Sequence, residues 1–372
     1  MVNEKVYFPN LNGLRFIAAA MVIVHHIEQL KSLVNLDSYW EKIQSIFIIG
    51  KQGVVLFFVL SGFLITYLLL SEEKNFKVFN IRKFYIRRIL RIWPLYFLII
   101  ILSFFVLPNI DFFILPDYGK DVIYDNITLK LFLYAIFFPN LVNAYWGIIP
   151  YASQTWSIGT EEQFYLIWPL LLKWIKKYRI VLMVLIVVVY AIINQFFVSS
   201  YSDNIPFKII LEPFWTTFRI DCMAIGGLFA ILLFKENKYI LNKFLFYIVI
   251  VIAIVLLIKG IYFPYYIHSV LYATLFGIII VNFAANKKIK ISLENRLLNY
   301  LGSISYGLYM YHPIGIIISI VIAKSLNFPS NWIIYPLSFS ITILMAGLSY
   351  KYFESFFLKF KPKFSIIKSG IV

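Results

Sequence analysis

The sequence predicts an all-α membrane protein: a polytopic bundle of about ten transmembrane helices plus a re-entrant segment, with both termini in the cytoplasm. Three observations lead to this fold class. Hydrophobic residues make up 61% of the 372 residues, whereas soluble domains are about half apolar. Mean hydropathy is +0.83, and aromatic residues, which are typical of lipid-facing surfaces and interfacial belts, reach 19%. Apolar runs close to the length of about 20 residues that a membrane crossing requires recur along the chain.

Apolar runs predict the position of each span in order, with soft boundaries. The predicted spans are 11–30, 53–71, 92–108, 161–175, 180–199, 210–234, 244–261, 265–285, 300–323 and 332–352. We expect the first to stay in the mature protein, because Arg15, His25, His26 and Glu28 interrupt it and no clear signal-peptide cleavage site follows.

The charged loops predict how these spans are oriented. Lysine and arginine gather in the connections 72–91, 173–179, 235–243 and 287–296, whereas 109–130 is acidic, so the positive-inside rule places the basic connections in the cytoplasm. They share one side only if 131–148 does not complete a crossing. We therefore expect 131–160 to be a re-entrant or interfacial excursion, which is possible where protein buries the backbone.

Composition also excludes several classes of function. The net charge of +16 does not indicate nucleic-acid binding, because the positive residues sit in short loops of a membrane protein. Cys222 is the single cysteine, which excludes an intramolecular disulfide and a multi-cysteine metal site, and with four histidines we expect no bound metal. One membrane domain is expected over 1–356, followed by a basic cytoplasmic tail over 357–372.

Two ionisable residues in the first span are the first candidates for a functional site. Arg15 and His26 are eleven residues apart, so on a helix they share one face to within about 20°, at a spacing of about 16 Å. Ionisable groups within a membrane are costly and usually face a bundle interior or a polar cavity. The alternative interpretations are that Arg15 reaches the nearby interface and that His26 is a hydrogen-bonded structural residue.

Arginines at the start of the third span suggest a phosphate site. Arg88 and Arg91 are three residues apart, hence neighbours on a helix, and guanidinium groups fit phosphate geometry. The same cluster is equally explained as a topology signal. In the second span, Ser61-Gly62 would let another helix or a thin ligand approach the backbone.

Three further polar groups lie within or beside spans. Glu161 and Glu162 head the fourth span, where one caps the helix or where either can orient His26 and raise its basicity. Arg219 and Asp221 form either a functional pair or a mutually neutralising structural one. Near Pro313, the side chains of Tyr306, Tyr309 and His312 line a sugar-sized pocket or pack at a kink.

Taken together, these strings resemble the acyltransferase-3 family of bacterial integral membrane O-acyltransferases. They follow the family's order over nearly the whole chain: Arg15 with ten residues before His26, Phe57-Phe58-Val59-Leu60-Ser61-Gly62, Arg87-Arg88-Ile89-Leu90-Arg91, Trp156-Ser157 with Glu161-Glu162-Gln163-Phe164-Tyr165, Arg219-Ile220-Asp221 and Ser305-Tyr306-Gly307-Leu308-Tyr309. One departure is Ser355, where the family usually has proline.

The resemblance implies a ten-helix core that transfers an acyl group, here expected to be acetyl, from cytoplasmic acyl-CoA to a hydroxyl of a cell-surface or exported glycan. It marks Arg15, His26, Ser61, the Arg88/Arg91 pair and Glu161 or Glu162. We expect this protein in the bacterial inner membrane, with His26 as general base held by Glu161 or Glu162, and with an acyl-histidine intermediate as a variant. Donor contacts are expected from Arg15, Ser61, Arg87, Arg88 and Arg91, and acceptor contacts from Tyr165, Arg219, Asp221, Tyr306 and Tyr309.

The opposing hypothesis is a proton-coupled small-solute or glycan-lipid transporter or flippase, with Arg15, His26, Arg219 and Asp221 along its path. The lack of an internal repeat of the kind found in transporters, and the adjacent arginine cluster, argue against it. The sequence does not predict the acceptor glycan, the modified hydroxyl, the acyl chain length or the oligomeric state.

Overall fold

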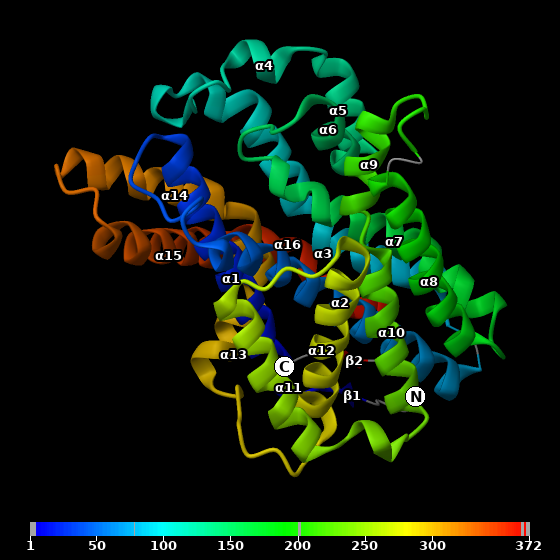
Figure 1. Ribbon diagram of the computed structural model, residues 1–372. Helices are drawn as coiled ribbons and strands as arrows, with labels where there is room; N and C mark the ends of the chain where they lie inside the picture. The colour runs from blue at the N-terminus through cyan, green and yellow to red at the C-terminus, as the bar shows by residue number, and fades with distance from the viewer. Residues whose placement is uncertain (1–4, 78, 200–201, 366–367, 370–372) are drawn as a thin grey trace.

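A computed structural model describes residues 5–77, 79–199, 202–365 and 368–369. Long helices make up most of it: α1 (Leu11–Leu33), α2 (Gln44–Phe76), α3 (Ile81–Ile101), α7 (Trp156–Trp174), α8 (Arg179–Val198), α9 (Lys208–Thr217), α10 (Ile220–Phe234), α11 (Lys243–Lys259), α12 (Tyr265–Ala285), α14 (Ser305–Ser325) and α15 (Asn331–Leu348). Shorter helices connect or extend them: α4 (Lys120–Tyr124), α5 (Ile127–Ala135), α6 (Pro139–Trp146), α13 (Arg296–Ser303) and α16 (Ser355–Leu358). Figure 1 shows the resulting bundle.

Each predicted span overlaps one or two of these helices, and the described part of the chain has seven helices long and apolar enough to cross a membrane. Polar side chains interrupt α1 and α7, and α11 has only 17 residues, so these three are not among the seven. The predicted span 210–234 is divided between α9 and α10, and the break lies at Phe218 and Arg219.

The bundle is organised around α2, which packs against α1, α10 and α12. The α2–α10 contact is so close that a Cβ at Gly62 would overlap the Met223 carbonyl, and one at Gly226 would overlap the Val59 carbonyl. Small residues at a helix contact allow this approach of two backbones. Gly62 therefore admits a neighbouring helix, as one of the two sequence alternatives predicted.

All the basic connections meet at one end of the bundle. Glu73, in the last turns of α2, accepts from Lys176 at 2.8 Å and from Arg179 at 2.7 Å, so the connections before α3 and before α8 lie together. Lys235 lines the same depression as Lys74 and Lys176, and Lys288 shares a second one with Lys238. This arrangement agrees with an excursion over 131–160 that does not complete a crossing. The short helices α4, α5 and α6 gather at the top of Figure 1, away from the two chain ends.

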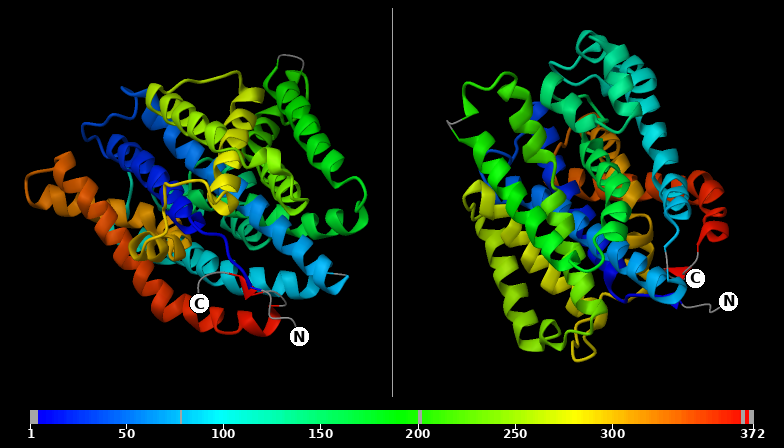
Figure 2. Two further views of the ribbon diagram at one scale, coloured as in Figure 1. Left: turned by 90° about the horizontal axis from the view of Figure 1, so that it is seen from below. Right: turned by 90° about the vertical axis from the view of Figure 1, so that its right-hand side faces the viewer.

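The first and last described segments meet at the same side of the molecule. Lys5–Val6 (β1) pairs in parallel with Lys368–Ser369 (β2), a two-residue ladder that is the only named sheet in the described residues, and in Figure 2 the blue start and the red end of the described chain lie close together. The described part of the expected tail over 357–372 contacts the helix bundle. Its 3₁₀ turn η8 (Lys361–Phe364) packs against α3, while residues 366–367 and 370–372 lie outside the described residues.

Candidate functional site

A cavity opens between α1, α2, α3, α7 and α14, near the end where the termini meet. Its polar lining residues are Tyr7, Asn12, Arg15, Ser61, Arg88, Arg91, Ser157, Glu161, Tyr165, Ser305, Tyr306, Tyr309 and Lys361. Eight of the predicted site residues are in this set, although they come from five different helices: Arg15, Ser61, Arg88, Arg91, Glu161, Tyr165, Tyr306 and Tyr309. The tertiary structure thus brings most of the predicted site into one space.

Four cationic side chains converge on the cavity: Arg15 from α1, Arg88 and Arg91 from α3, and Lys361 from η8. Arg15 Nη1 donates to Asn12 Oδ1 at 3.2 Å. The Arg88 guanidinium lies 5.6 Å from the centroid of the Tyr165 ring, and its buried Nε has no hydrogen-bond partner among the described residues. Burial, together with the charges of Arg91, Arg88 and Arg15, lowers the pKa of Lys361 to about 6. Four basic side chains share this cavity with one carboxylate, that of Glu161, and such an excess of basic groups fits an anion.

A chain of hydroxyls lies beside these cations. Tyr165 Oη donates to Glu161 Oε2 at 2.8 Å, and the Ser61 hydroxyl bonds to Tyr165 Oη. Since the proton of Tyr165 is committed to Glu161, Ser61 is the donor in the second bond. Ser61 is on α2, whereas Tyr165 and Glu161 are on α7, so only the packing of α7 on α2 completes this chain of hydrogen bonds.

Arg87 does not belong to the cavity, contrary to the expectation that it contacts the donor. Its Nη2 is 2.6 Å from Glu72 Oε1, and its Nη1 donates to the Phe364 carbonyl at 2.9 Å. Arg87 points away from Arg88 because neighbours on a helix are about 100° apart. Its role is to fasten the C-terminal segment, which carries Lys361, to α3.

The predicted pairing of His26 with Glu161 or Glu162 is wrong. His26 Nδ1 bonds to the Val22 carbonyl at 2.9 Å, Glu161 accepts from Tyr165, and Glu162 accepts from Trp93 Nε1 at 3.0 Å. The helix α7 begins at Trp156, five residues before the predicted start of this span at Glu161. Five helical residues rise by about 8 Å, so Glu161 lies about 8 Å deeper in the bundle than it would if the helix began there. Both carboxylates therefore sit at the depth of the arginines and not at that of His26.

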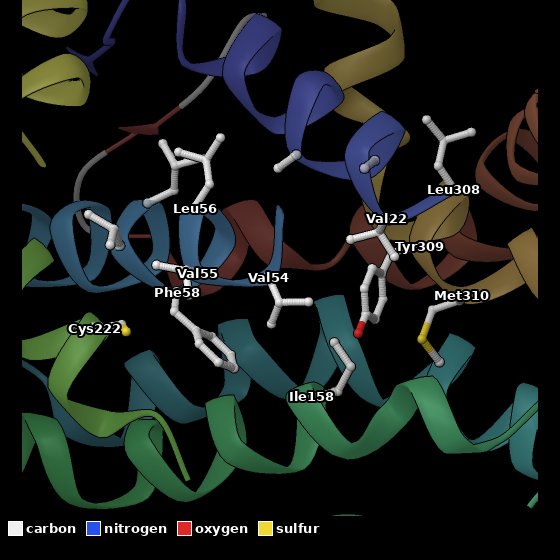
Figure 3. Close-up of a cluster of buried hydrophobic side chains, with 14 of the residues drawn as sticks. Val22, Val54, Val55, Leu56, Phe58, Ile158, Cys222, Leu308, Tyr309 and Met310 are labelled. Atoms are coloured by element: carbon white, nitrogen blue, oxygen red, sulfur yellow. The ribbon is translucent and has the colours of Figure 1, made fainter. Parts of the chain in front are cut away.

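The inner part of the cavity is apolar and ends at Tyr309. Figure 3 shows Val22, Val54 and Ile158 beside this ring, with Phe58 further along α2, and all of these except Val22 line the cavity. Tyr309 Oη bonds to Ser157 Oγ at 2.7 Å and donates to the Gln154 carbonyl at 2.9 Å, which fixes the ring. Tyr306, which also lines the cavity, donates to the Ile92 carbonyl at 2.8 Å.

Arg219 and Asp221 do not line this cavity. Arg219 lies at the break before α10, and Asp221 is buried in the first turn of α10, with no hydrogen-bond partner for its Oδ1 among the described residues. The contact of α10 with α2 separates them from Arg15 and Arg88. The structure therefore does not group them with the other predicted acceptor contacts.

Sequence reasoning missed Lys361 and Ser157 as cavity residues. In the sequence, Lys361 is one of several lysines in the C-terminal tail. No spacing links it to α3, which lies more than 250 residues earlier in the chain. Ser157 belongs to the Trp156-Ser157 motif of the family resemblance, but nothing in that motif marks it as a cavity residue. Its contact with Tyr309 is a signal that only the structure carries.

Comparison with known proteins places nearly the whole chain in a family. A family model described as an acyltransferase domain matches residues 8–351. The chain is 25% identical to the peptidoglycan O-acetyltransferase OatA of Listeria monocytogenes, over 95% of this chain and 56% of that protein. It is 29% identical to a putative O-acetyltransferase of Staphylococcus aureus strain COL, over 95% and 58%, and 27% identical to the putative peptidoglycan O-acetyltransferase YrhL of Bacillus subtilis, over 94% and 54%. The chain thus spans somewhat more than half the length of these relatives. No solved structure gives a significant match.

Proposed function

Since the chain belongs to the acyltransferase-3 family, we propose that it is a membrane O-acetyltransferase, which moves an acetyl group from acetyl-CoA to a hydroxyl of a cell-surface or exported glycan. The observation that carries this proposal is the convergence of Arg15, Arg88, Arg91 and Lys361 on one cavity. The names of the relatives, which include peptidoglycan O-acetyltransferases, support a glycan as the acceptor.

The donor fits the cationic part of the cavity. Coenzyme A carries a diphosphate and a further phosphate, and guanidinium and ammonium groups bind such oxygens through strong charge-assisted hydrogen bonds. The four cations lie near the end where the basic connections gather, which the positive-inside rule assigns to the cytoplasm, the compartment that holds acyl-CoA. The bilayer to be crossed is then the bacterial inner membrane, with both chain ends on its cytoplasmic side.

The thioester end of the donor would extend from the cations along the apolar part of the cavity toward Tyr309. It passes Ser61, whose hydroxyl donates to Tyr165, which in turn donates to Glu161. The acceptor hydroxyl attacks the carbonyl carbon, the bond from carbon to sulfur breaks, and the hydroxyl proton reaches the departing thiolate by way of a base. His26, one helical turn beyond Val22, is the base that we propose; a transient acyl-histidine is a variant of the same role.

Release of free thiol from acetyl-CoA by the purified protein in nanodiscs tests the proposal. Arg88→Gln removes a charged contact with phosphate, which contributes about 1.5–3 kcal/mol, so KM for acetyl-CoA should rise about 10- to 150-fold with little change in kcat. Arg91→Gln should act in the same direction. Arg82→Gln is the matched control, because Arg82 lies on the same helix but is exposed and does not line the cavity.

Two results would overturn this function. One is the absence of thiol release from acetyl-CoA by a correctly inserted protein, accompanied by saturable solute flux in proteoliposomes, which would favour the transporter hypothesis. The other is an effect of Arg88→Gln on KM no larger than that of Arg82→Gln, which would remove the cavity from donor binding.

A further inference from the structure

Two imidazole rings from distant parts of the chain meet inside the bundle. The ring centroids of His26 on α1 and His312 on α14 are 4.7 Å apart, and His312 has no exposed surface. His312 belongs to the string before Pro313, to which the proposed function assigns no role.

Hydrogen bonds to the backbone fix the tautomer of both rings. His26 Nδ1 is 2.9 Å from the Val22 carbonyl, and His312 Nδ1 is 2.6 Å from the Tyr309 carbonyl. A carbonyl oxygen only accepts, so Nδ1 carries the hydrogen in each neutral ring, and each Nε2 presents a lone pair. Both rings are thus oriented as bases.

The lone pair of His312 is unused. Its Nε2 is buried and has no hydrogen-bond partner among the described residues. Leaving a buried acceptor unpaired costs about 1–3 kcal/mol, so a purely structural histidine at this place would be an expensive choice. The atom that would complete the site has to bring a proton.

The position of the pair relative to the cavity indicates where this proton comes from. The Tyr309 ring lines the inner cavity and is 5.8 Å from the His312 ring, centroid to centroid, and the Tyr309 carbonyl holds His312. Val22, whose carbonyl holds His26, lies beside Tyr309 and Val54 in Figure 3. The two imidazoles therefore lie just beyond the inner end of the cavity, opposite the four cations.

We propose that His312 is a positioning residue for His26, and that the two imidazoles share the proton taken from the acceptor hydroxyl. This inference rests on the proposed function. The hydroxyl gives its proton to Nε2 of His26 as its oxygen attacks the thioester carbon. The resulting imidazolium of His26 then donates to the unpaired Nε2 of His312, which has to move into hydrogen-bond distance for this step, and the proton passes to the thiolate of coenzyme A when the bond from carbon to sulfur breaks. His312 thus stabilises the imidazolium, the task that a carboxylate performs in other His-based sites.

His312→Asn is the sharpest test, because the amide nitrogen of asparagine can replace Nδ1 as donor to the Tyr309 carbonyl, whereas Nε2 is lost. We expect kcat to fall about 100-fold or more, as for loss of general-base assistance, with KM for acetyl-CoA within about twofold. Thermal stability should change little, because the amide keeps the hydrogen bond to the Tyr309 carbonyl and its oxygen replaces one buried unpaired acceptor with another. His312→Gln, whose amide oxygen can occupy the place of Nε2, should restore part of kcat.

His25→Asn is the matched control. His25 also neighbours His26, with ring centroids 4.8 Å apart, but its Nδ1 bonds to the Ile46 carbonyl and its ring packs on Trp40, away from His312 and the cavity. We expect its kcat to stay within about threefold of the wild type. In the double variant His26→Asn/His312→Asn, the loss should be no larger than for His26→Asn alone, because the two act as one unit.

Two results would overturn the inference. If wild-type protein releases thiol from acetyl-CoA and His312→Asn keeps its kcat, or loses kcat and stability in parallel, His312 is structural, while the proposed function stands. Independently of turnover, ¹⁵N spectra of histidine-labelled protein in bilayers, assigned with the two asparagine variants, should show His26 and His312 protonated at Nδ1. A His312 ring protonated at Nε2 would refute the shared proton even if the chain were not a transferase.

Discussion

Binding of acetyl-CoA should take up a proton at Lys361. This lysine is half-buried at the cavity, where burial and the charges of Arg91, Arg88 and Arg15 lower its pKa from 10.5 to about 6. In the free protein at pH 8 about 99% of Lys361 is then neutral. A donor phosphate placed among these cations reverses the balance and favours the ammonium form.

The size and sign of the effect follow from the pKa of Lys361. Protonating Lys361 at pH 8, two units above its pKa, costs about 3 kcal/mol, and this cost makes the binding free energy of acetyl-CoA less favourable by the same amount. Binding should therefore weaken about tenfold per pH unit between about pH 7 and 9, and become stronger as the pH falls toward 6. Phosphate monoesters have a second pKa near 6, so above pH 7 the donor contributes little to this uptake.

Isothermal titration calorimetry in buffers of different ionisation enthalpy measures the uptake directly. At pH 8 we expect about one proton per acetyl-CoA bound in the wild type, and none in Lys361→Met. Lys363→Met is the control, because Lys363 is exposed on the same short turn and does not line the cavity. Zero uptake in the wild type, or an uptake that survives Lys361→Met, would refute the reasoning.

Two predictions concern the scaffold of the site. Gly62→Ala should lower the free energy of unfolding by about 3 kcal/mol or more, because the new methyl group overlaps the carbonyl of Met223, whose backbone cannot easily move aside. Denaturation in detergent measures this loss. Gly119→Ala is the control, because its methyl group meets only the side chain of Asp121. Arg87→Met should cost about 3–5 kcal/mol by leaving Glu72 buried and unpaired, and Glu72→Met/Arg87→Met should recover most of it. If the double variant is as unstable as Arg87→Met, the cost comes from loss of the Phe364 contact and not from the unpaired charge.

The sequence was sufficient for the parts of this protein that depend on local pattern. Apolar length predicts a helix at every span, and loop charge predicts that the basic connections share one end, which the pairing of Glu73 with Lys176 and Arg179 confirms. It also located most of the cationic part of the cavity, since Arg88 and Arg91 are neighbours on one helix by spacing alone.

Which side chains meet between helices was decided by the tertiary structure alone. Ser61 lies against Tyr165, and His312 lies against His26, because contacts between helices depend on the depth, rotation and tilt of each helix. Those quantities are set by close packing such as that of Gly62 on Met223, and by the excursion before α7, neither of which leaves a periodic signal in the chain. The sequence therefore determined the membrane class, the helices and the charge at the cavity, whereas only packing decided which groups stand beside the proposed base.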